Sequence, residues 1–261
     1  MFVYIFLISI FLSLNLFANT DFFSDDIPLE KPKEQKIVLL TFDDGPIKAT
    51  KNVLKVIKKE DIPITMFFIG SQIEKSKHIY EKALDFSNIT IANHTYSHAN
   101  HKYKKFYSNP LNVVEDIKKA NTIISQDRIS NSASDFLPVR LAGRNVFRLP
   151  DIKINDYAIS KEQQEKEMSV YDDLFNEGFY IYGWDIEWEY EFNGQPIQTP
   201  EEVLNSMERI YKSKLTTKEN KVILLMHDIM FSSHFEGEKN LNTLITLLKN
   251  HGWSFESIEN Y

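Results

Sequence analysis

The sequence predicts an α/β fold in which parallel strands alternate with helices and close into a barrel. Short apolar runs, typical of buried strands, alternate with stretches of helical periodicity along the chain after residue 35. Such alternation is typical of a parallel sheet, and the number of units favours a barrel over an open sheet. The chain has 261 residues, 43% of them hydrophobic, which is enough for one domain with a sizeable core.

The expected elements follow one another in a regular order. The strands are apolar runs that end in polar residues or glycine, at residues 37–40, 64–70, 89–92, 136–141, 179–185 and 222–228. The helices between them place apolar residues at helical spacing, over residues 50–60, 71–86, 111–125, 171–177, 200–211 and 241–249. The polar stretch 151–168 is expected to be either an excursion between strands or a short surface helix.

The first 35 residues are expected to lie outside this domain. Residues 2–17 are almost entirely apolar and precede Ala18 and a polar stretch, so residues 1–18 have the pattern of a secretory signal peptide. An uncleaved anchor is the alternative and would be the chain's only membrane contact. Residues 19–35 indicate a linker, so the domain covers residues 36–261. The protein is therefore expected to be exported to the periplasm, the cell envelope or the medium.

Composition excludes several classes of protein and site. The formal net charge is −7, with 30 basic against 37 acidic residues, so a nucleic-acid partner is not expected. The chain contains no cysteine, which excludes disulfides, thiolate nucleophiles and zinc–thiolate sites.

Two adjacent acids, Asp43 and Asp44, follow the first expected strand and precede Gly45. The carboxyl ends of parallel strands are where α/β folds place their chemistry. Two neighbouring carboxylates repel each other, so this position invites a cation or a proton between them. An ordinary Asp-Gly turn with solvated acids is the alternative.

Two histidines follow the third expected strand. His94 and His98 are four positions apart, so one helical turn would put both imidazoles on one side. Two imidazoles and one carboxylate form a three-ligand site with an open position for water, the arrangement of catalytic zinc. Because His101 makes this region generally rich in histidine, polar loop residues are the alternative.

Residues 41–46, Thr-Phe-Asp-Asp-Gly-Pro, and residues 94–98, His-Thr-Tyr-Ser-His, resemble two motifs of a known family. They are similar to the first two motifs of the polysaccharide deacetylases of the NodB-homology type, carbohydrate esterase family 4. The resemblance implies a deformed (β/α) barrel of about seven parallel strands with outer helices and an open groove. It also implies removal of N-acetyl groups from N-acetylglucosamine units of a glycan such as peptidoglycan or a chitin-like polymer.

Carried over residue by residue, the resemblance gives the two acids different roles. Asp43 would be the general base that takes a proton from the attacking water. Asp44 would join His94 and His98 in holding a divalent metal ion, usually zinc, with cobalt or nickel as alternatives. The ion would polarise the acetyl carbonyl and stabilise the oxyanion that develops on it.

Residues 225–227, Leu-Met-His, resemble the fifth motif of the family. By this resemblance Leu225 lines the pocket for the acetyl group and His227 is the general acid. An amide needs such an acid, because an amine anion is a very poor leaving group and the nitrogen must be protonated as the intermediate collapses. A lone histidine after a strand would more often be structural.

The family's third motif, Arg-x-Pro-x-aromatic, is matched imperfectly. Arg140 keeps the arginine at the end of the fourth expected strand, but Ala142 replaces the proline and Arg144 the aromatic residue. We expect Arg140 to pair with the base and orient it, because a strand end can reach it. Arg148, which does precede a proline two positions later, is the alternative.

The fourth motif places an aspartate and a tryptophan after the fifth strand, and residues 184–188, Trp-Asp-Ile-Glu-Trp, have that composition but are one residue shorter. Asp185 ends the expected strand and is expected to hydrogen-bond the final histidine, hold it and raise its pKa, with Glu187 as the alternative. Trp188 is expected to wall the pocket for the acetyl methyl group and the sugar face, with core packing as the alternative.

Taken together, these motifs favour an exported, metal-dependent deacetylase that acts on N-acetylglucosamine of a cell-wall glycan, with peptidoglycan as the first expectation. The alternatives are an O-acetyl glycan esterase on the same fold and a non-catalytic carbohydrate-binding wall protein that kept the barrel and lost turnover.

Overall fold

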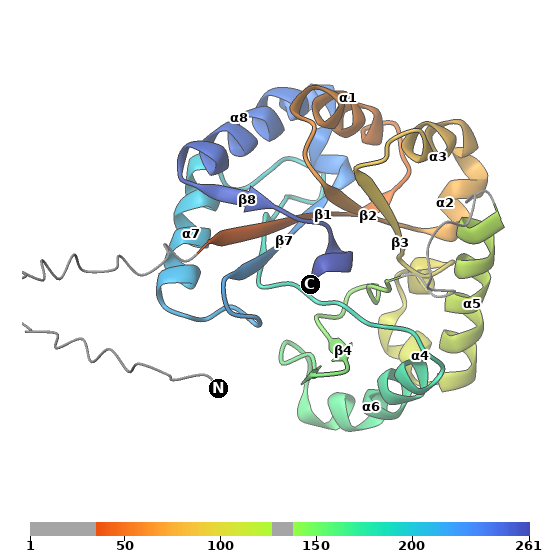
Figure 1. The fold of residues 1–261 in the computed structure, drawn as a ribbon. Helices are drawn as coiled ribbons and strands as arrows, with labels where there is room; N and C mark the ends of the chain where they lie inside the picture. Colours follow the sequence, from red (N-terminus) through yellow and green to blue (C-terminus); the bar gives the residue numbers. More distant parts are fainter. Residues whose placement is uncertain (1–34, 127–137) are drawn as a thin grey trace, which may run out of the picture. The chain divides into compact units, whose positions relative to one another are not determined.

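The computed structural model describes residues 35–126 and 138–261. These residues form a parallel sheet covered by helices, a deformed (β/α) barrel, which confirms the predicted fold class (Figure 1). The expected signal peptide and nearly all of the expected linker fall on residues 1–34, outside the described part, and stay predictions. Within the described part, no helix combines the length and the apolar character that crossing a bilayer requires.

The strands of the main sheet run parallel. In order across the sheet they are β3 (Ile89–Asn93), β2 (Ile64–Phe68), β1 (Lys36–Gly45), β7 (Lys221–His227) and β6 (Ile186–Glu187), and β8 (Trp253–Phe255) pairs with the first residues of β1. β1 lies at the centre because its run of apolar residues is buried on both faces, as expected for a strand inside an α/β fold.

Single bridges extend the sheet beyond β3. Asn93 bridges Val139, and Val139 bridges Ile181, both in parallel. The segment after Ile181 then continues into β6, which pairs with β7 on the other side of the sheet. One segment, residues 181–187, thus connects both edges of the sheet.

The prediction of strands at residues 136–141 and 179–185 is therefore wrong, because the described residues of these ranges pair with the sheet only through these single bridges. Of residues 136–141, the first two lie outside the described part, and only Val139 pairs. Pro138 cannot donate to a ladder, and the residue that follows Val139 turns its side chain into the site described below.

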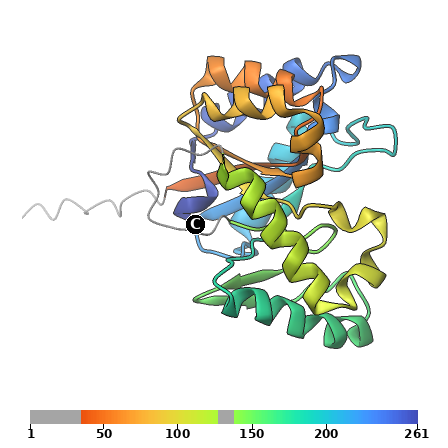
Figure 2. The ribbon, with the colours of Figure 1, turned by 90° about the vertical axis from the view of Figure 1, so that its right-hand side faces the viewer.

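The helices cover the outside of the sheet. They are α1 (Thr50–Glu60), α2 (Gly70–Lys75), α3 (Lys77–Leu84), α4 (Tyr103–Tyr107), α5 (Pro110–Gln126), α6 (Lys161–Asn176), α7 (Pro200–Lys212) and α8 (Gly237–Asn250), with 3₁₀ turns η1 (His98–His101), η2 (Asp228–Phe231), η3 (Ser233–Phe235) and η4 (Ile258–Asn260). Figure 2 shows α5 running from the sheet toward α6.

Two helical expectations need correction. The single helix expected over residues 71–86 is two helices that meet at Ser76. The short helix expected at 171–177 begins much earlier, at Lys161, because the Ser160 hydroxyl accepts the Gln163 N–H and caps it. Before it lies an antiparallel hairpin of β4 (Phe147–Leu149) and β5 (Ile152–Ile154), which the sequence pattern did not predict.

Alternate residues of β1 face opposite sides of the sheet. Leu40 and Phe42 belong to the core between the sheet and its helices, whereas Leu39 belongs to a smaller core inside the barrel. Asp43 lies on the same face of β1 as Leu39, inside the barrel, and is the last residue of β1 on that face before the strand bulges. Burial on both faces fixes this register, since a slip by one residue would exchange the two rows and send Asp43 outward.

Candidate active site

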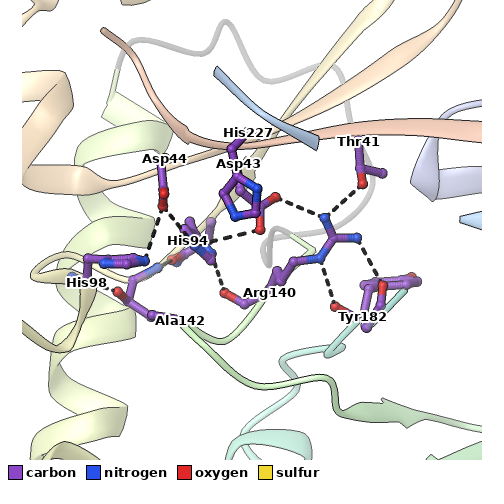
Figure 3. A network of polar contacts seen from close by, with 12 residues as sticks. Thr41, Asp43, Asp44, His94, His98, Arg140, Ala142, Tyr182 and His227 are labelled. Atoms are coloured by element: carbon purple, nitrogen blue, oxygen red, sulfur yellow. Dashed lines mark hydrogen bonds and ion pairs between the residues drawn. The ribbon is translucent and has the colours of Figure 1, made fainter. Parts of the chain in front are cut away.

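A cavity of about 540 Å³ lies at the carboxyl ends of β1, β3 and β7. Among its lining residues are seven of those singled out in the sequence, namely Asp43, Asp44, His94, His98, Glu187, Leu225 and His227. Figure 3 shows five of them close together, with Arg140 beside Asp43. Separate strands thus deliver the candidate residues to one place.

Asp43 is held by Arg140. Both side chains are almost completely buried, and Arg140 Nη1 lies 2.9 Å from Asp43 Oδ1 and 2.8 Å from Thr41 Oγ1. The other two nitrogens of this guanidinium donate to backbone carbonyls, Nη2 to that of Gly183 at 2.9 Å and Nε to that of Tyr182 at 3.3 Å (Figure 3). Arg140 therefore fixes one carboxylate oxygen of Asp43 and joins β1 to the segment that leads into β6.

Arg148, the alternative partner of the base, lies elsewhere. Its Nε donates to Asp172 Oδ1 at 2.6 Å, and its Nη1 donates to the Ile154 carbonyl at 2.9 Å. Arg148 thus holds the β4–β5 hairpin against α6 and does not contact Asp43. The structure places Arg140 alone of the two arginines at the candidate base.

Asp44 reaches the same cavity through a break in the strand. Neighbouring residues of a strand point to opposite faces, so a regular β1 would turn Asp44 away from Asp43. The pairing of β1 with β2 shifts register between Asp43 and Gly45, and Asp44 has φ of +70°. This bulge brings the Asp44 carboxylate round to the histidines, with Oδ1 at 3.3 Å from His94 Nε2 and 3.1 Å from His98 Nε2.

A loop, and not the expected helical turn, brings His94 and His98 together. Thr95 has φ of +65° and His98 φ of +50°, both left-handed. The Asn93 side chain accepts the Thr95 N–H at 2.8 Å, and the Thr95 hydroxyl accepts the His98 N–H at 3.0 Å. These two side-chain turns fold the segment back, so the two imidazole centroids lie 5.1 Å apart.

The three residues fit a divalent metal ion. One ligand atom from each of Asp44, His94 and His98 lies within 4.8 Å of the others. His94 Nδ1 lies 2.9 Å from the Arg140 carbonyl, and because a carbonyl can only accept, Nδ1 carries the proton and Nε2 offers its lone pair. Within the described residues the buried Asp44 Oδ1 accepts no hydrogen bond, although both imidazoles face it.

The electrostatics of this group favour a cation. Burial would raise the pKa of Asp44, but the two imidazoles hold it well below its ordinary value. Burial would lower the pKa of His94, but the carboxylates of Asp43 and Asp44 raise it. Both shifts stabilise positive charge beside the carboxylates, which is the condition for binding a metal ion there.

Asp185 does not hold His227, so this expectation is wrong. Its carboxylate accepts the backbone N–H of Thr217 at 2.7 Å and of Ile223 at 2.8 Å. Because β6 begins only at residue 186, the Ile223 N–H of β7 needs a side-chain acceptor, and Asp185 supplies it. The acid near His227 is Glu187, whose Oε1 lies 3.8 Å from His227 Nδ1.

His227 lies in the cavity wall with little support from polar groups. Its Nδ1 is buried and has no hydrogen-bond partner among the described residues. The ring of Tyr190 packs against it at 4.8 Å between centroids. Burial lowers the pKa of His227, contrary to the expected rise, and burial also raises the pKa of Glu187 to about 7.

Trp188, expected to wall the pocket, lies outside the cavity, and another tryptophan lines it. Trp188 is completely buried, packs on Phe231 and donates its Nε1–H to the Gln198 carbonyl at 2.8 Å. It is a core residue and does not line the cavity. Trp184 lines it instead, with its ring 5.8 Å from the Arg140 guanidinium. Trp184 was not singled out from the sequence, although it directly precedes Asp185. Position in the expected strand does not tell which of the two tryptophans faces the cavity and which faces the core.

Comparisons with known proteins agree with the motifs and the fold. Residues 30–133 match the family model for polysaccharide deacetylase. A peptidoglycan-N-acetylglucosamine deacetylase of Bacillus cereus is 32% identical over 41% of this chain and 35% of its own length. The catalytic domain of a peptidoglycan N-acetylglucosamine deacetylase from Eubacterium rectale shares the fold, with a TM-score of 0.62 and 23% identity over 87% of this chain and 90% of that one.

A third protein has the same fold but is described as a pseudoenzyme. It is a pseudoenzyme of carbohydrate esterase family 4 from Bacillus anthracis, with a TM-score of 0.55 and 20% identity over 87% of this chain and 65% of that one. Fold likeness at this identity therefore shows the architecture and leaves activity to the site residues. The family match over residues 30–133, the two aspartate and histidine motifs and the shared fold thus agree in making this chain similar to the polysaccharide deacetylases.

Proposed function

We propose that the protein is an exported, metal-dependent deacetylase that removes N-acetyl groups from N-acetylglucosamine units of a cell-wall glycan, with peptidoglycan as its first candidate substrate. The observation behind this proposal is the grouping of Asp44, His94 and His98 beside Asp43 in one cavity, with His227 on the same wall.

The chain's own residues can manage the protons of the first step. A divalent cation held by the three ligands would supply a Lewis acid for the acetyl carbonyl and favour ionisation of the attacking water. Asp43 stands beside that group, with Oδ2 at 3.7 Å from His94 Nε2, so it can accept the proton of the water. Arg140 binds the other oxygen of Asp43, which leaves Oδ2 directed to the cavity.

His227 fits the second proton transfer. Cleavage of the C–N bond releases an amine, and the nitrogen must gain a proton as the bond breaks. His227 lines the same cavity as Asp43 but comes from a different strand, so the acid and the base can act on different atoms of the substrate. An ester has a better leaving group and needs this acid less, which favours the amide over an O-acetyl ester.

The first test is acetate release from N-acetylglucosamine oligomers and from purified peptidoglycan. Metal-stripped protein should be inactive, and added zinc should restore release. Asp43→Asn should lower the rate by about 10²–10⁴-fold, the usual contribution of a general acid or base. Cobalt and nickel, tried in the same way, would identify the metal that supports the highest rate.

His78→Ala is the matched control, because His78 lies on α3 and does not line the cavity. It should leave acetate release unchanged. Absence of acetate from both materials with zinc bound would contradict the proposal. Release from O-acetylated glycans alone would then identify an esterase, and glycan binding without turnover would identify a binding protein.

Export belongs to the same proposal and rests on the apolar run at residues 2–17. Its test is N-terminal sequencing of the protein recovered from outside the cytoplasm. A mature chain that begins after residue 18 would support cleavage of a signal peptide, and retention of the whole chain in the cytoplasm would contradict export.

A further inference from the structure

Tyr157 is an exposed aromatic residue that lines the candidate active-site cavity. Its side chain is 81% exposed, although the preceding residue, Asp156, is only 4% exposed. The cavity that contains Asp43 and His227 extends to Tyr157, which follows the β4–β5 hairpin. The backbone on either side of this exposed ring is anchored by the buried side chains of Arg148 and Asp156.

Arg148 fixes the chain before Tyr157. This buried arginine donates from Nη1 to the Ile154 carbonyl and from Nη2 to Asn155 Oδ1 at 2.6 Å, while its Nε holds Asp172 on α6. Because Arg148 occupies the oxygen of the Asn155 amide, the Nδ2 donors point away from it. Within residues 35–126 and 138–261 these donors have no hydrogen-bond partner.

Asp156 fixes the chain on the other side. Its Oδ1 accepts the Ala158 N–H at 2.9 Å, which closes a turn around Tyr157, and its Oδ2 accepts the Asn145 N–H at 3.4 Å. The Asn145 side chain in turn pairs with both backbone groups of Trp184, each at 3.0 Å. The turn is thereby tied to the cavity wall, and the Tyr157 ring is its free part.

We propose that Tyr157 is the platform of a second sugar subsite, where a neighbouring sugar of the glycan stacks on its ring while another unit is deacetylated. This rests on the proposed function. A pyranose presents an apolar face of C–H groups beside polar hydroxyls, and an aromatic ring and an amide donor that line the same cavity suit both. A backbone fixed on both sides lowers the entropy that binding would otherwise cost.

The subsite makes the protein sensitive to glycan length. Binding and kcat/KM should rise from the disaccharide of N-acetylglucosamine to the hexasaccharide, because only longer chains reach Tyr157. Tyr157→Ala should remove this gain by raising KM roughly 2- to 12-fold on the hexasaccharide, the range of an aromatic contact. It should leave kcat, and the kcat/KM for the disaccharide, unaffected. Tyr157→Phe should keep the rise of kcat/KM with oligomer length.

Tyr180→Ala is the matched control. Tyr180 is a partly exposed tyrosine that stacks on Phe175 and does not line the cavity. It should keep the length dependence of the unchanged protein. Equal length dependence in Tyr157→Ala and the unchanged protein, or an equal loss on every length, would overturn the proposal.

Calorimetric binding of the same oligomers to zinc-loaded Asp43→Asn protein, with and without Tyr157→Ala, separates this proposal from the proposed function. A length-dependent affinity that Tyr157→Ala removes would support the subsite even where no acetate is released. The same affinity for all lengths, with or without Tyr157→Ala, would overturn the subsite even where the enzyme is active.

Discussion

The two sides of the candidate active-site cavity are built in different ways. On one side, called here the sheet side, Asp43, His94 and His227 stand at or just after the ends of β1, β3 and β7, which parallel ladders join, directly for β1 and β7 and through β2 for β1 and β3. On the other, called the loop side, Arg140 follows a single bridge at Val139, and Trp184 stands between a single bridge at Ile181 and the two-residue strand β6. The loop side is held instead by bonds from side chains to the backbone.

This difference shows how one site can combine fixed chemistry with adjustable surroundings. A ladder places its end residues through many backbone bonds, so no single side chain decides where Asp43 lies. On the loop side, one asparagine holds Trp184 and one arginine holds residues 182 and 183. Substitutions there should therefore move the wall of the cavity while the ladder remains.

The largest effect on activity is expected on the sheet side. His98→Ala removes one of three candidate ligands and should lower metal affinity by more than the roughly 10- to 100-fold that loss of an outer partner costs. Acetate release should fall with it. His101→Ala is the matched control, because His101 lies 5.1 Å from the His98 ring but outside the ligand group. Equal metal loss in both variants would contradict the assignment.

Arg140 joins the two sides, so its loss should be the most destabilising. Arg140→Gln leaves the buried Asp43 carboxylate without its ion pair and two carbonyls without donors. Breaking a buried pair in this way typically costs about 3–5 kcal/mol. Urea unfolding measures it, with the exposed Arg209→Gln on α7 as control. A decrease in the free energy of unfolding no greater than that of the control would show that the ion pair does not hold the two sides together.

The two tryptophans of residues 184–188 should separate stability from activity. Trp188→Phe deletes a buried N–H donor and leaves the Gln198 carbonyl unpaired, at a cost of about 1–3 kcal/mol. Trp184→Phe changes the cavity wall and should alter KM with little change in stability. Thermal unfolding and acetate kinetics on both variants test this, and a reversed pattern would return the pocket role to Trp188.

The smallest effect is expected at the acid beside His227, and it should depend on pH. Glu187 has a pKa raised to about 7, so it is neutral below that pH and charged above it. Glu187→Gln is neutral throughout. The two proteins should therefore agree in kcat/KM on the acid side, and the variant should fall several-fold below the unchanged protein above about pH 7, where the anion helps His227 keep its proton.

Asp185→Asn is the companion variant. Because Asp185 accepts two backbone N–H groups and does not contact His227, its change should lower stability and leave the shape of the pH profile unaltered. A changed profile in this variant, together with an unchanged one in Glu187→Gln, would restore the original assignment of Asp185.

The sequence predicted the sheet side well, for a physical reason. Apolar runs such as residues 37–40 and 222–226 determine which residues form ladders, and a ladder places whatever follows it. The expected cluster of Asp43, Asp44, His94 and His98 was found in one cavity. The reason given for the histidine pair was wrong, because left-handed residues in a loop, not a helical turn, close the spacing.

The loop side could not be predicted in the same way. Whether Asp185 or Glu187 faces His227 depends on where β6 begins, and Ile186–Glu187 is too short for periodicity to reveal. Trp184 and Trp188 are the same residue type four positions apart, and only the fold decides that Trp188 packs in the core and Trp184 lines the cavity. The anchoring of Tyr157 depends on contacts of Arg148 and Asp156 that sequence spacing does not encode.

The position of β1 has a consequence for how the molecule folds. Two of its neighbours, one on each edge, come from the opposite part of the chain, since Ile37 pairs with Lys221 of β7 and Lys36 pairs with Trp253 of β8. Contacts between residues so distant in sequence slow folding, because the intervening chain must be ordered first. During synthesis the edge of β1 stays open until β7 has been made, and an apolar strand with an open edge can pair with other chains. Asp43 and His227 therefore come together late, when β7 joins β1, so the site is among the last features of the fold to form.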